Sequence, residues 1–384
     1  MILRGKEKIV SIIIGADFVP TKTNENLFAS GDLRTLIGDD LVEVLQAADY
    51  RIFNLEMPLT NFEQCIAKCG PNLKADPQSI KAYKNASIDL FTLANNHIMD
   101  YGEEGLNATI NILKQNAISY VGVGANLDEA KKPIFFNFKE KKIGVYACAE
   151  NEFSIAGENS MGANPFDPLE SLDHIVEAKG NCDYLIVLYH GGKEHYRYPS
   201  PNLQKRCRKI VRKGADLVLC QHSHCVGCEE RYNDSVIVYG QGNFLFDITE
   251  HECWQSGMLV CIDDNFDISY IPIEKRGNLV RKSTNKNIIE NFNKRSCEIQ
   301  KEGFIQEEYA RFASTMCDSY LLSMSAQRRF LIRRIINKLS SYKYDKKLLS
   351  KKYKKENLLA IQNFIECEAH HELLLRGIKD RINR

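Results

Sequence analysis

The sequence predicts an α/β fold with mixed sheets, and three features of the chain lead to this prediction. From about residue 8 to residue 275, short apolar runs alternate with helical patterns. Glycines or polar clusters bound these runs, as is typical of buried strands. Two of the runs, 134–138 and 143–149, are separated only by Lys139–Lys142, which predicts a turn between the two strands. A sheet with such a hairpin is not purely parallel, so we expect mixed sheets.

The other expected elements follow in chain order. The apolar runs that predict further strands cover 9–14, 50–55, 88–93, 184–189, 217–220 and 236–239. Helical patterns lie near 35–48, 77–86, 103–116, 168–180 and 200–213. The runs are continuously apolar and short, which is typical of strands buried inside a protein.

Polar clusters follow the strands at the points where they are expected to end. The side chains that these clusters supply are Asp17, Glu56, Asn96, His97, His190, His222 and His224. Sites in open α/β sheets assemble just beyond the carboxyl ends of strands. The set offers nitrogen and oxygen donors without a thiolate, which suits two divalent ions such as Mn²⁺, Zn²⁺ or Fe²⁺.

The stretch His222-Ser-His224 is the most informative of these clusters. Two imidazoles two residues apart, on irregular chain just past a strand, can point into one cavity and reach one metal. The alternative is a polar loop with incidental histidines. The clusters at the other strand ends favour the metal site.

The character of the chain changes after about residue 276. Strand signals fade, and helical stretches rich in Leu, Ile, Lys and Arg run to the end. We therefore expect an α/β domain over 1–275 and a helical, basic region over 276–384. Basic residues dominate 328–355, where Asp345 is the one acid. This segment is either a helix packed on the α/β domain or a surface for an anionic membrane or acidic polymer.

Composition narrows the class of protein. The 384 residues are enough for one substantial domain and a second one, and the net charge is +1. The whole chain therefore has no field that would draw it to nucleic acid or membrane. No apolar stretch approaches the roughly 20 residues that span a bilayer, and residues 1–8 do not resemble a signal peptide. We expect a cytoplasmic protein, with 328–355 as the part that would contact the inner face of the membrane.

The 13 cysteines are an odd number, and several, such as Cys220, sit inside apolar runs. Reduced thiols explain them better than a disulfide framework does. Cys225-Val-Gly-Cys228 has the spacing of half a zinc site but no matching second pair, because Cys65 and Cys69 are spaced differently. We interpret these as incidental thiols.

Seven ordered motifs resemble those of the CapA family, which is named for a poly-γ-glutamate capsule biosynthesis protein and built on a calcineurin-like metallophosphoesterase fold. They are Gly15-Ala-Asp17, Asn54-Leu-Glu-Met-Pro58, Ala94-Asn-Asn-His-Ile-Met-Asp-Tyr-Gly102, His190-Gly-Gly192, Gly214-Ala-Asp216, His222-Ser-His224 and Tyr239-Gly-Gln-Gly-Asn-Phe244. The resemblance covers roughly residues 9–265. It implies an αββα sandwich of two mixed sheets flanked by helices, followed here by the helical C-terminal extension.

The resemblance also assigns six residues to two metal positions. The first-metal ligands would be Asp17 and His224, the bridging ligand Glu56, and the second-metal ligands Asn96, His190 and His222. A pair of cations would stabilise an oxyanion and lower the pKa of a bound water for an in-line displacement.

By the same resemblance, His97 would not be a ligand but the acid that protonates the leaving oxygen, with Asp100 orienting it. An imidazole suits this function because it exchanges protons near neutral pH.

Three departures from the family pattern bear on the chemistry. Calcineurin-like enzymes usually have Asp-x-His at the first strand, but position 19 is Val19. The first metal would therefore lack a histidine, which implies weaker or different metal binding. Gln221 replaces the usual glycine before the histidine pair, and Gly191 replaces the aromatic that commonly follows the preceding histidine.

The motifs are compatible with three functions. The first is a metal-dependent hydrolase of a phosphoester, or of a related bond in a polymer precursor, linked to capsule or surface-polymer biosynthesis. The second is a non-hydrolytic assembly factor that binds an acidic polymer such as poly-γ-glutamate. The third, a nucleic-acid phosphodiesterase, is disfavoured because duplex binding usually needs a basic surface.

Overall fold

The computed structural model describes residues 11–324 and 343–382. The chain divides into two compact units, Met1–Gln306 and Glu307–Arg384. Three expectations lie wholly or partly outside the described residues: the N-terminal stretch 1–8, the start of the first strand at 9–10, and the basic segment up to residue 342.

The first sheet has seven strands in the order β15-β14-β13-β1-β2-β3-β4. Its strands are β1 (Ile12–Asp17), β2 (Tyr50–Asn54), β3 (Leu90–Thr92), β4 (Ser119–Val121), β13 (Ser256–Ile262), β14 (Ile268–Arg276) and β15 (Leu279–Lys282). The strands β1 to β4 are parallel, whereas β13, β14 and β15 join β1 as an antiparallel edge. The sheet is therefore mixed, as predicted.

The second sheet has six strands in the order β11-β12-β10-β9-β7-β6. They are β6 (Ile134–Phe138), β7 (Lys141–Ala149), β9 (Tyr184–His190), β10 (Leu217–Gln221), β11 (Glu229–Tyr232) and β12 (Ser235–Tyr239). The four central strands are parallel, and each edge ends in an antiparallel hairpin. A further small sheet pairs β5 (Val123–Gly124) with β8 (Gly162–Ala163).

Alternation along the strands separates three apolar cores. In β1, Ile12 and Ile14 face a core shared with strands of the second sheet, whereas Ile13 faces a different core that includes residues of the first helices. In β9, Ile186 joins the shared core, and Val187 joins a third core with residues of later helices. Successive side chains of a strand point to opposite faces. The two sheets therefore stack on each other, and helices cover both outer faces.

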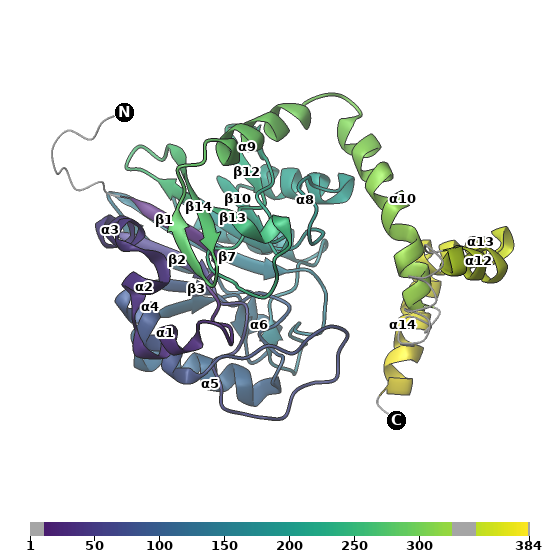
Figure 1. Ribbon diagram of the computed structural model, residues 1–384, viewed down its shortest axis with the longest axis horizontal. Helices are drawn as coiled ribbons and strands as arrows, with labels where there is room; N and C mark the ends of the chain where they lie inside the picture. The colour runs from purple at the N-terminus through teal and green to yellow at the C-terminus, as the bar shows by residue number, and fades with distance from the viewer. Residues whose placement is uncertain (1–10, 325–342, 383–384) are drawn as a thin grey trace. The chain divides into compact units, whose positions relative to one another are not determined.

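The helices of the outer layers include those that were expected, together with short helices at 25–30 and 127–130 that were not (Figure 1). Those of the first layer are α1 (Glu25–Ser30), α2 (Leu33–Ile37), α3 (Asp39–Ala47), α4 (Ile80–Asn85) and α5 (Gly102–Gln115). Those of the second are α7 (Ser171–Gly180) and α8 (Pro201–Arg212), and α6 (Leu127–Ala130) follows β5. Ser200 caps α8 by accepting a hydrogen bond from Leu203 N, and Pro201 occupies its first position, a favourable start for a helix.

The first compact unit extends past residue 275. The predicted boundary falls at the end of β14, and β15 pairs with β14 beyond it. The helix α9 (Asn287–Glu298) buries Ile288 and Phe292 in the core between the sheets. The strand β15 is short and carries Arg281 and Lys282, so its sequence does not form a clear apolar run.

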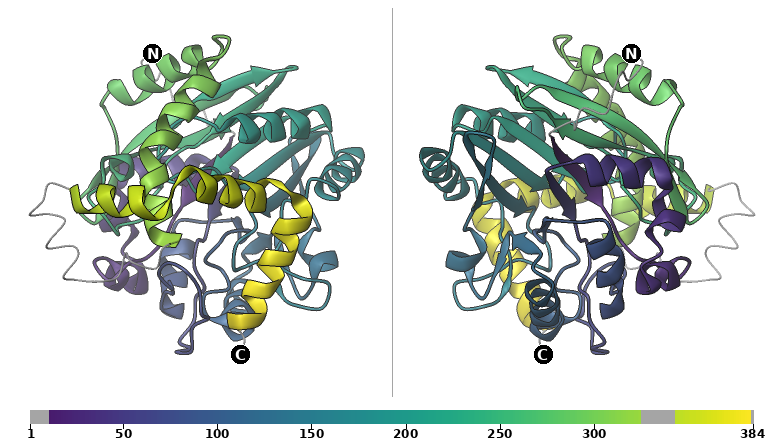
Figure 2. Two further views of the ribbon diagram at one scale, coloured as in Figure 1. Left: turned by 90° about the vertical axis from the view of Figure 1, so that its right-hand side faces the viewer. Right: turned by 90° about the vertical axis from the view of Figure 1, so that its left-hand side faces the viewer.

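The second unit is helical, as expected. Its helices in the described part of the chain are α10 (Phe304–Met324), which begins within the first unit, α12 (Lys343–Lys352), α13 (Lys355–Glu366) and α14 (Glu368–Ile382). They appear in the yellow-green to yellow part of Figure 2. None of the helices in the described ranges is long and apolar enough to cross a membrane.

A glycine at the end of the first strand allows close packing below the site. A Cβ added at Gly15 would lie 2.2 Å from Cε1 of Phe53, which itself packs edge-on against Phe244. We expect Gly15→Ala to lower the free energy of unfolding by about 1–3 kcal/mol through overpacking, measured by urea unfolding.

Gly180→Ala is the matched control, because an added Cβ there meets no atom within 4 Å. It should leave the stability unchanged or raise it by up to about 1 kcal/mol. Equal stabilities of the two variants would contradict this account of Gly15.

Candidate active site

Five strand ends from the two sheets deliver the predicted site residues to one place. Asp17 is the last residue of β1, Glu56 lies two residues beyond β2, and Asn96 lies four residues beyond β3. His190 ends β9, and His222 follows β10 directly. These strands run parallel within their sheets, so their carboxyl ends meet at one edge.

Asp17, Glu56 and His224 form the first group of donors. One possible ligand atom from each lies within 4.8 Å of the others, and all three side chains are buried. His224 Nδ1 is 3.3 Å from Asp17 Oδ2 and 2.9 Å from Asn243 Oδ1. Asn54 Nδ2 donates a 2.6 Å hydrogen bond to Asp17 Oδ1. The carboxylate is thereby fixed in direction.

Glu56, His190 and His222 form the second group, which satisfies the same distance limit. His190 Nε2 lies 3.0 Å from Asn96 Oδ1 and 3.5 Å from Glu56 Oε1. The rings of His190 and His222 have centroids 4.8 Å apart. Glu56 belongs to both groups, as expected for a bridging residue.

Burial keeps two of the imidazoles in the form that binds metals. The pKa of His190 is lowered well below its usual value, first by burial and then by the charges of His224 and His97. The pKa of His222 is lowered in the same way, first by burial and then by His190. Neutral imidazole is the form that ligates a metal.

On the carboxylate side of the site, the pKa values of Glu56 and His224 are raised rather than lowered. The pKa of Glu56 is raised well above its usual value, first by burial and then by the negative charge of Asp17. Burial acts to lower the pKa of His224, but its hydrogen bond and attraction to Asp17 raise it overall. Neighbouring carboxylates are costly to bury together unless positive charge compensates them.

Three buried atoms of the site agree with a bound cation that offsets the charge of the buried carboxylates. Within the described residues, Glu56 Oε2, His190 Nδ1 and His222 Nδ1 are buried and have no hydrogen-bond partner. Buried polar atoms without a partner are uncommon in folded proteins. The donor types and these unsatisfied atoms fit a divalent cation.

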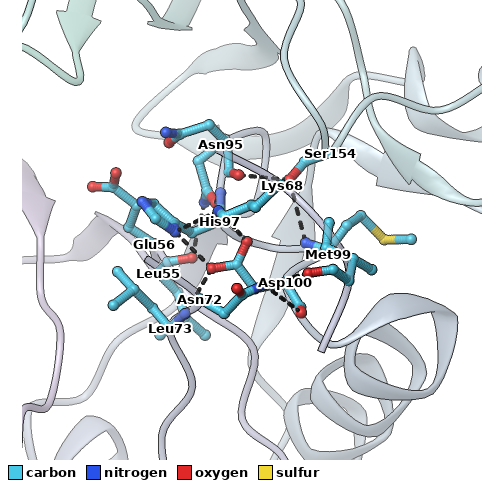
Figure 3. Close-up of polar contacts among 12 residues, drawn as sticks. Leu55, Glu56, Lys68, Asn72, Leu73, Asn95, His97, Met99, Asp100 and Ser154 are labelled. Atoms are coloured by element: carbon cyan, nitrogen blue, oxygen red, sulfur yellow. Dashed lines mark hydrogen bonds and ion pairs between the residues drawn. The ribbon is translucent and has the colours of Figure 1, made fainter. Parts of the chain in front are cut away.

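His97 and Asp100 form a direct pair beside the donor groups (Figure 3). His97 Nδ1 lies 2.7 Å from Asp100 Oδ2, and the Asp100 side chain is fully buried. Leu73 N donates a 2.7 Å hydrogen bond to the same oxygen. The imidazole is therefore oriented by a carboxylate that is itself held in place.

Lys68 joins this pair and was not anticipated from the sequence. Its Nζ forms an ion pair with Asp100 Oδ1 and lies 3.1 Å from His97 Nδ1. The side chain of Lys68 is only 3% exposed. It comes from the long loop between β2 and α4, where no local pattern distinguishes it from a surface lysine.

Asparagines form a second set of residues that the sequence did not reveal. Asn95 Nδ2 donates to Asn54 Oδ1 and to Leu55 O, while Asn95 Oδ1 accepts from His97 N. Asn243 contacts His224. Asn54, Asn95 and Asn243 all lie within the motifs that carry the family resemblance, so the motif positions were a usable signal.

The backbone at the histidine pair adopts an uncommon conformation. His222 has φ 91° and His224 has φ 55°. Such values are rare and costly for residues other than glycine, and they cluster at functional sites. This backbone conformation agrees with a segment that holds both imidazoles at the donor groups.

The departures at positions 19 and 221 have structural explanations. Val19 is fully buried in the apolar core that covers the outer face of the first sheet, so this position offers no ligand. Gln221 Nε2 approaches Gly15 O at 3.4 Å and links the second sheet to the first.

All 13 cysteines are free thiols, as expected. Cys225 and Cys228 are buried. Among the described residues, the donor groups that could hold a metal contain no cysteine.

These features define a class: an αββα sandwich of two mixed sheets, with a buried nitrogen and oxygen donor set at the strand ends. The model of the family "Bacterial capsule synthesis protein PGA_cap" matches residues 17–248. The chain belongs to this family, which confirms the resemblance predicted from its motifs.

Two curated relatives come from Bacillus. The "PGA biosynthesis protein CapA" of Bacillus subtilis is 32% identical over 213 residues, covering 53% of this chain and 55% of that protein. The "Capsule biosynthesis protein CapA" of Bacillus anthracis is 32% identical over 212 residues, covering 53% and 52%. The chain thus matches about half the length of these relatives.

Among solved structures, a "novel phosphatase" of Mycoplasma pneumoniae aligns with a TM-score of 0.43 and 14% identity, covering 70% of this chain and 95% of that one. The fold assignment rests instead on the strand order of the chain and on the family match.

Metal binding should depend on the buried histidines. We expect His190→Ala or His222→Ala to weaken Mn²⁺ binding by at least about tenfold, because each removes a proposed ligand. Elemental analysis and calorimetric titration of folded variants measure this. Cys225→Ser and Cys228→Ser are the controls and should keep the metal, whereas unchanged metal content in both histidine variants would refute the assignment.

The buried pair of Lys68 and Asp100 makes a second prediction. Lys68→Met leaves a buried carboxylate without its ammonium partner and should lower the free energy of unfolding by about 3 kcal/mol. Urea unfolding provides the measurement.

Lys74→Met on the same loop is the control, since Lys74 pairs with Glu63, which is 88% exposed. Its cost should be about 1 kcal/mol or less. A similar loss in both variants would show that Lys68 contributes no more than a surface lysine.

Proposed function

We propose that this protein is a metal-dependent hydrolase of the metallophosphoesterase type, acting on a phosphoester or a related bond in capsule or surface-polymer biosynthesis. The observation that carries the proposal is the buried donor set lying beside the oriented pair of His97 and Asp100. The donor set alone would fit a binding protein. A positioned proton donor next to it favours a reaction.

Two divalent ions fit the donors. Asp17 and His224 would hold one ion, and Asn96, His190 and His222 the other, with Glu56 shared between them. Mn²⁺, Zn²⁺ and Fe²⁺ accept such a mixture of imidazole, carboxylate and amide ligands. When bound, a pair of such ions stabilises negative charge on the substrate and makes water a stronger nucleophile.

His97 would protonate the leaving oxygen. Asp100 holds His97 through Nδ1, so Nε2 is the nitrogen from which a proton can be transferred. The His97 side chain is 12% exposed, whereas Asp100 is fully buried. The imidazole can therefore reach a substrate while its partner stays inaccessible to it.

Lys68 would reduce the electrostatic attraction between Asp100 and His97. Its ammonium lies on the other oxygen of the same carboxylate and offsets the negative charge there. In a buried setting, such an ion pair also fixes the position of both groups. The three side chains would then act as one rigid unit.

The names of the two Bacillus relatives favour a second function. Both are described by PGA or capsule biosynthesis, which agrees with a site that binds an acidic polymer without cleaving it. The two functions differ in one measurable property, because only a hydrolase turns over.

A panel of phosphoester substrates separates them. We expect Mn²⁺-dependent release of the leaving group that is abolished by EDTA and restored by adding the metal. Metal binding without turnover on phosphoesters, together with retention of poly-γ-glutamate, would instead support the assembly function.

His97 should distinguish metal binding from chemistry. His97→Ala should keep its metal and lose about 10²–10⁴-fold in kcat, because it removes the proton donor but no ligand. Calorimetric titration and steady-state kinetics measure the two effects. Loss of metal in this variant would mean that His97 is a ligand and that the acid lies elsewhere.

A further inference from the structure

Glu194 lies in the loop between β9 and α8, next to the donor groups but outside the predicted ligand set. One of its carboxylate oxygens, one nitrogen of His222 and one of His224 all lie within 4.8 Å of one another. We propose that Glu194 is a metal ligand that completes the centre where Val19 supplies no donor. This inference rests on the proposed metal-dependent function.

The three donor groups share members in a way that includes Glu194. Glu56 belongs to both buried groups. Glu194 lies within ligand distance of His224 from the first group and of His222 from the second. Glu194 therefore lies beside one histidine of each buried group, whereas Glu56 belongs to both groups.

The first group is the one that needs a further donor. It contains Asp17, Glu56 and His224, and zinc in proteins usually has at least four ligands. The residue two positions after Asp17 is Val19, whose side chain is packed into the outer apolar core. The fourth ligand of this ion therefore comes either from a different segment of the chain or from water.

The loop that carries Glu194 is fixed against the histidine pair. His195 N donates a 2.9 Å hydrogen bond to Ser223 O, the residue between the two histidines. His195 has φ 60°, and its ring stacks on His251 with centroids 4.3 Å apart. Trp254 Nε1 donates a 2.8 Å hydrogen bond to His195 Nε2. These contacts place the adjacent carboxylate beside the site, although Glu194 itself is 45% exposed.

The surroundings of Glu194 agree with this function. One of its carboxylate oxygens lies within 4.8 Å of a nitrogen of His222 and of a nitrogen of His224, so the carboxylate is on the side of the donor groups. It forms an ion pair with the partly exposed Lys193 at 4.0 Å, and such surface pairs contribute little to stability. His222 is 8% exposed, and its Nδ1 is buried without a hydrogen-bond partner in the described chain. An unsatisfied imidazole nitrogen of this kind points to a missing ligand partner.

Titration of the metal-free protein with Mn²⁺ tests the inference. Glu194→Gln keeps the shape of the side chain and removes its charge. We expect this variant to lose at least tenfold in affinity for one Mn²⁺ equivalent while a second equivalent stays near the wild-type value. Glu194→Asp keeps the charge on a shorter side chain. Its affinity for that Mn²⁺ equivalent should lie between those of Glu194→Gln and the wild type.

Glu140→Gln is the matched control, because Glu140 is exposed in the turn between β6 and β7. It should bind Mn²⁺ as the wild type does. Thermal unfolding without metal should be the same for all variants, and only the Mn²⁺-induced rise in Tm should shrink in Glu194→Gln. A lower Tm without metal, with an unchanged Mn²⁺ response, would assign Glu194 a structural function and overturn the inference.

Two further outcomes separate this inference from the proposed function. If the wild type binds Mn²⁺ and Glu194→Gln binds it equally well, the metal centre stands but Glu194 is not a ligand. An effect of Glu194→Gln on KM alone would also overturn it and make Glu194 a substrate contact. If the wild type binds no Mn²⁺, Zn²⁺ or Fe²⁺, the proposed function and the inference both fail.

Discussion

Burial of a charged donor set where the two sheets meet is the constraint on which the site depends. Asp17, Glu56, His190, His222 and His224 are each at least nine-tenths buried. Removing such groups from water is costly unless hydrogen bonds or opposite charge compensate them. Asn54 and Asn243 compensate part of this cost through their contacts with Asp17 and His224. Glu56 Oε2 remains buried without a hydrogen-bond partner among the described residues, as expected for an atom that a cation would bind.

The sandwich supplies the rigidity that this arrangement needs. Its inner apolar core joins both sheets, and buried amides link them near the site. Gln241 Nε2 donates to Ile14 O at 3.0 Å and to Met258 O at 3.1 Å, and Gln221 reaches Gly15 O. The bonds to Ile14 O and Gly15 O join β1 to the second sheet, and the bond to Met258 O joins β13 to the segment that follows β12. The unusual backbone of His222 and His224 is held between these fixed ends, which is how strained residues persist in folded proteins.

Loops between the strands and helices bring further charged residues to the site. The loop after β2 places Lys68 on Asp100, and the loop after β9 places Glu194 beside the histidine pair. Both loops are tied by backbone contacts: Ile66 N donates to Asp100 O, and His195 N donates to Ser223 O. Loops anchored on a rigid scaffold are where binding and catalytic residues concentrate. A common sandwich can thus carry a donor set that differs at single positions, such as Val19.

The sequence by itself determined the strands that carry the site and the donor types that follow them. Ile12–Asp17 and Tyr184–His190 form strands because their apolar character is local, and the polar residues at their ends are adjacent in the chain. The family motifs added the sandwich and the functions expected of Asn96 and His97. The apolar runs and the motifs each lie within a short window of sequence, so they can be recognised without knowledge of long-range contacts.

Only the tertiary structure decided which donors meet. Lys68 is 32 residues from Asp100 in sequence, and no pattern records that the loop between them returns to the site. The side-chain direction of Val19 and the position of Glu194 likewise depend on packing between segments that are distant in the chain. The first unit continues to Gln306 because β15 and α9 find partners in the sheets, not because their own sequences require it. Local pattern predicts elements, whereas burial and long-range contacts determine how they are combined.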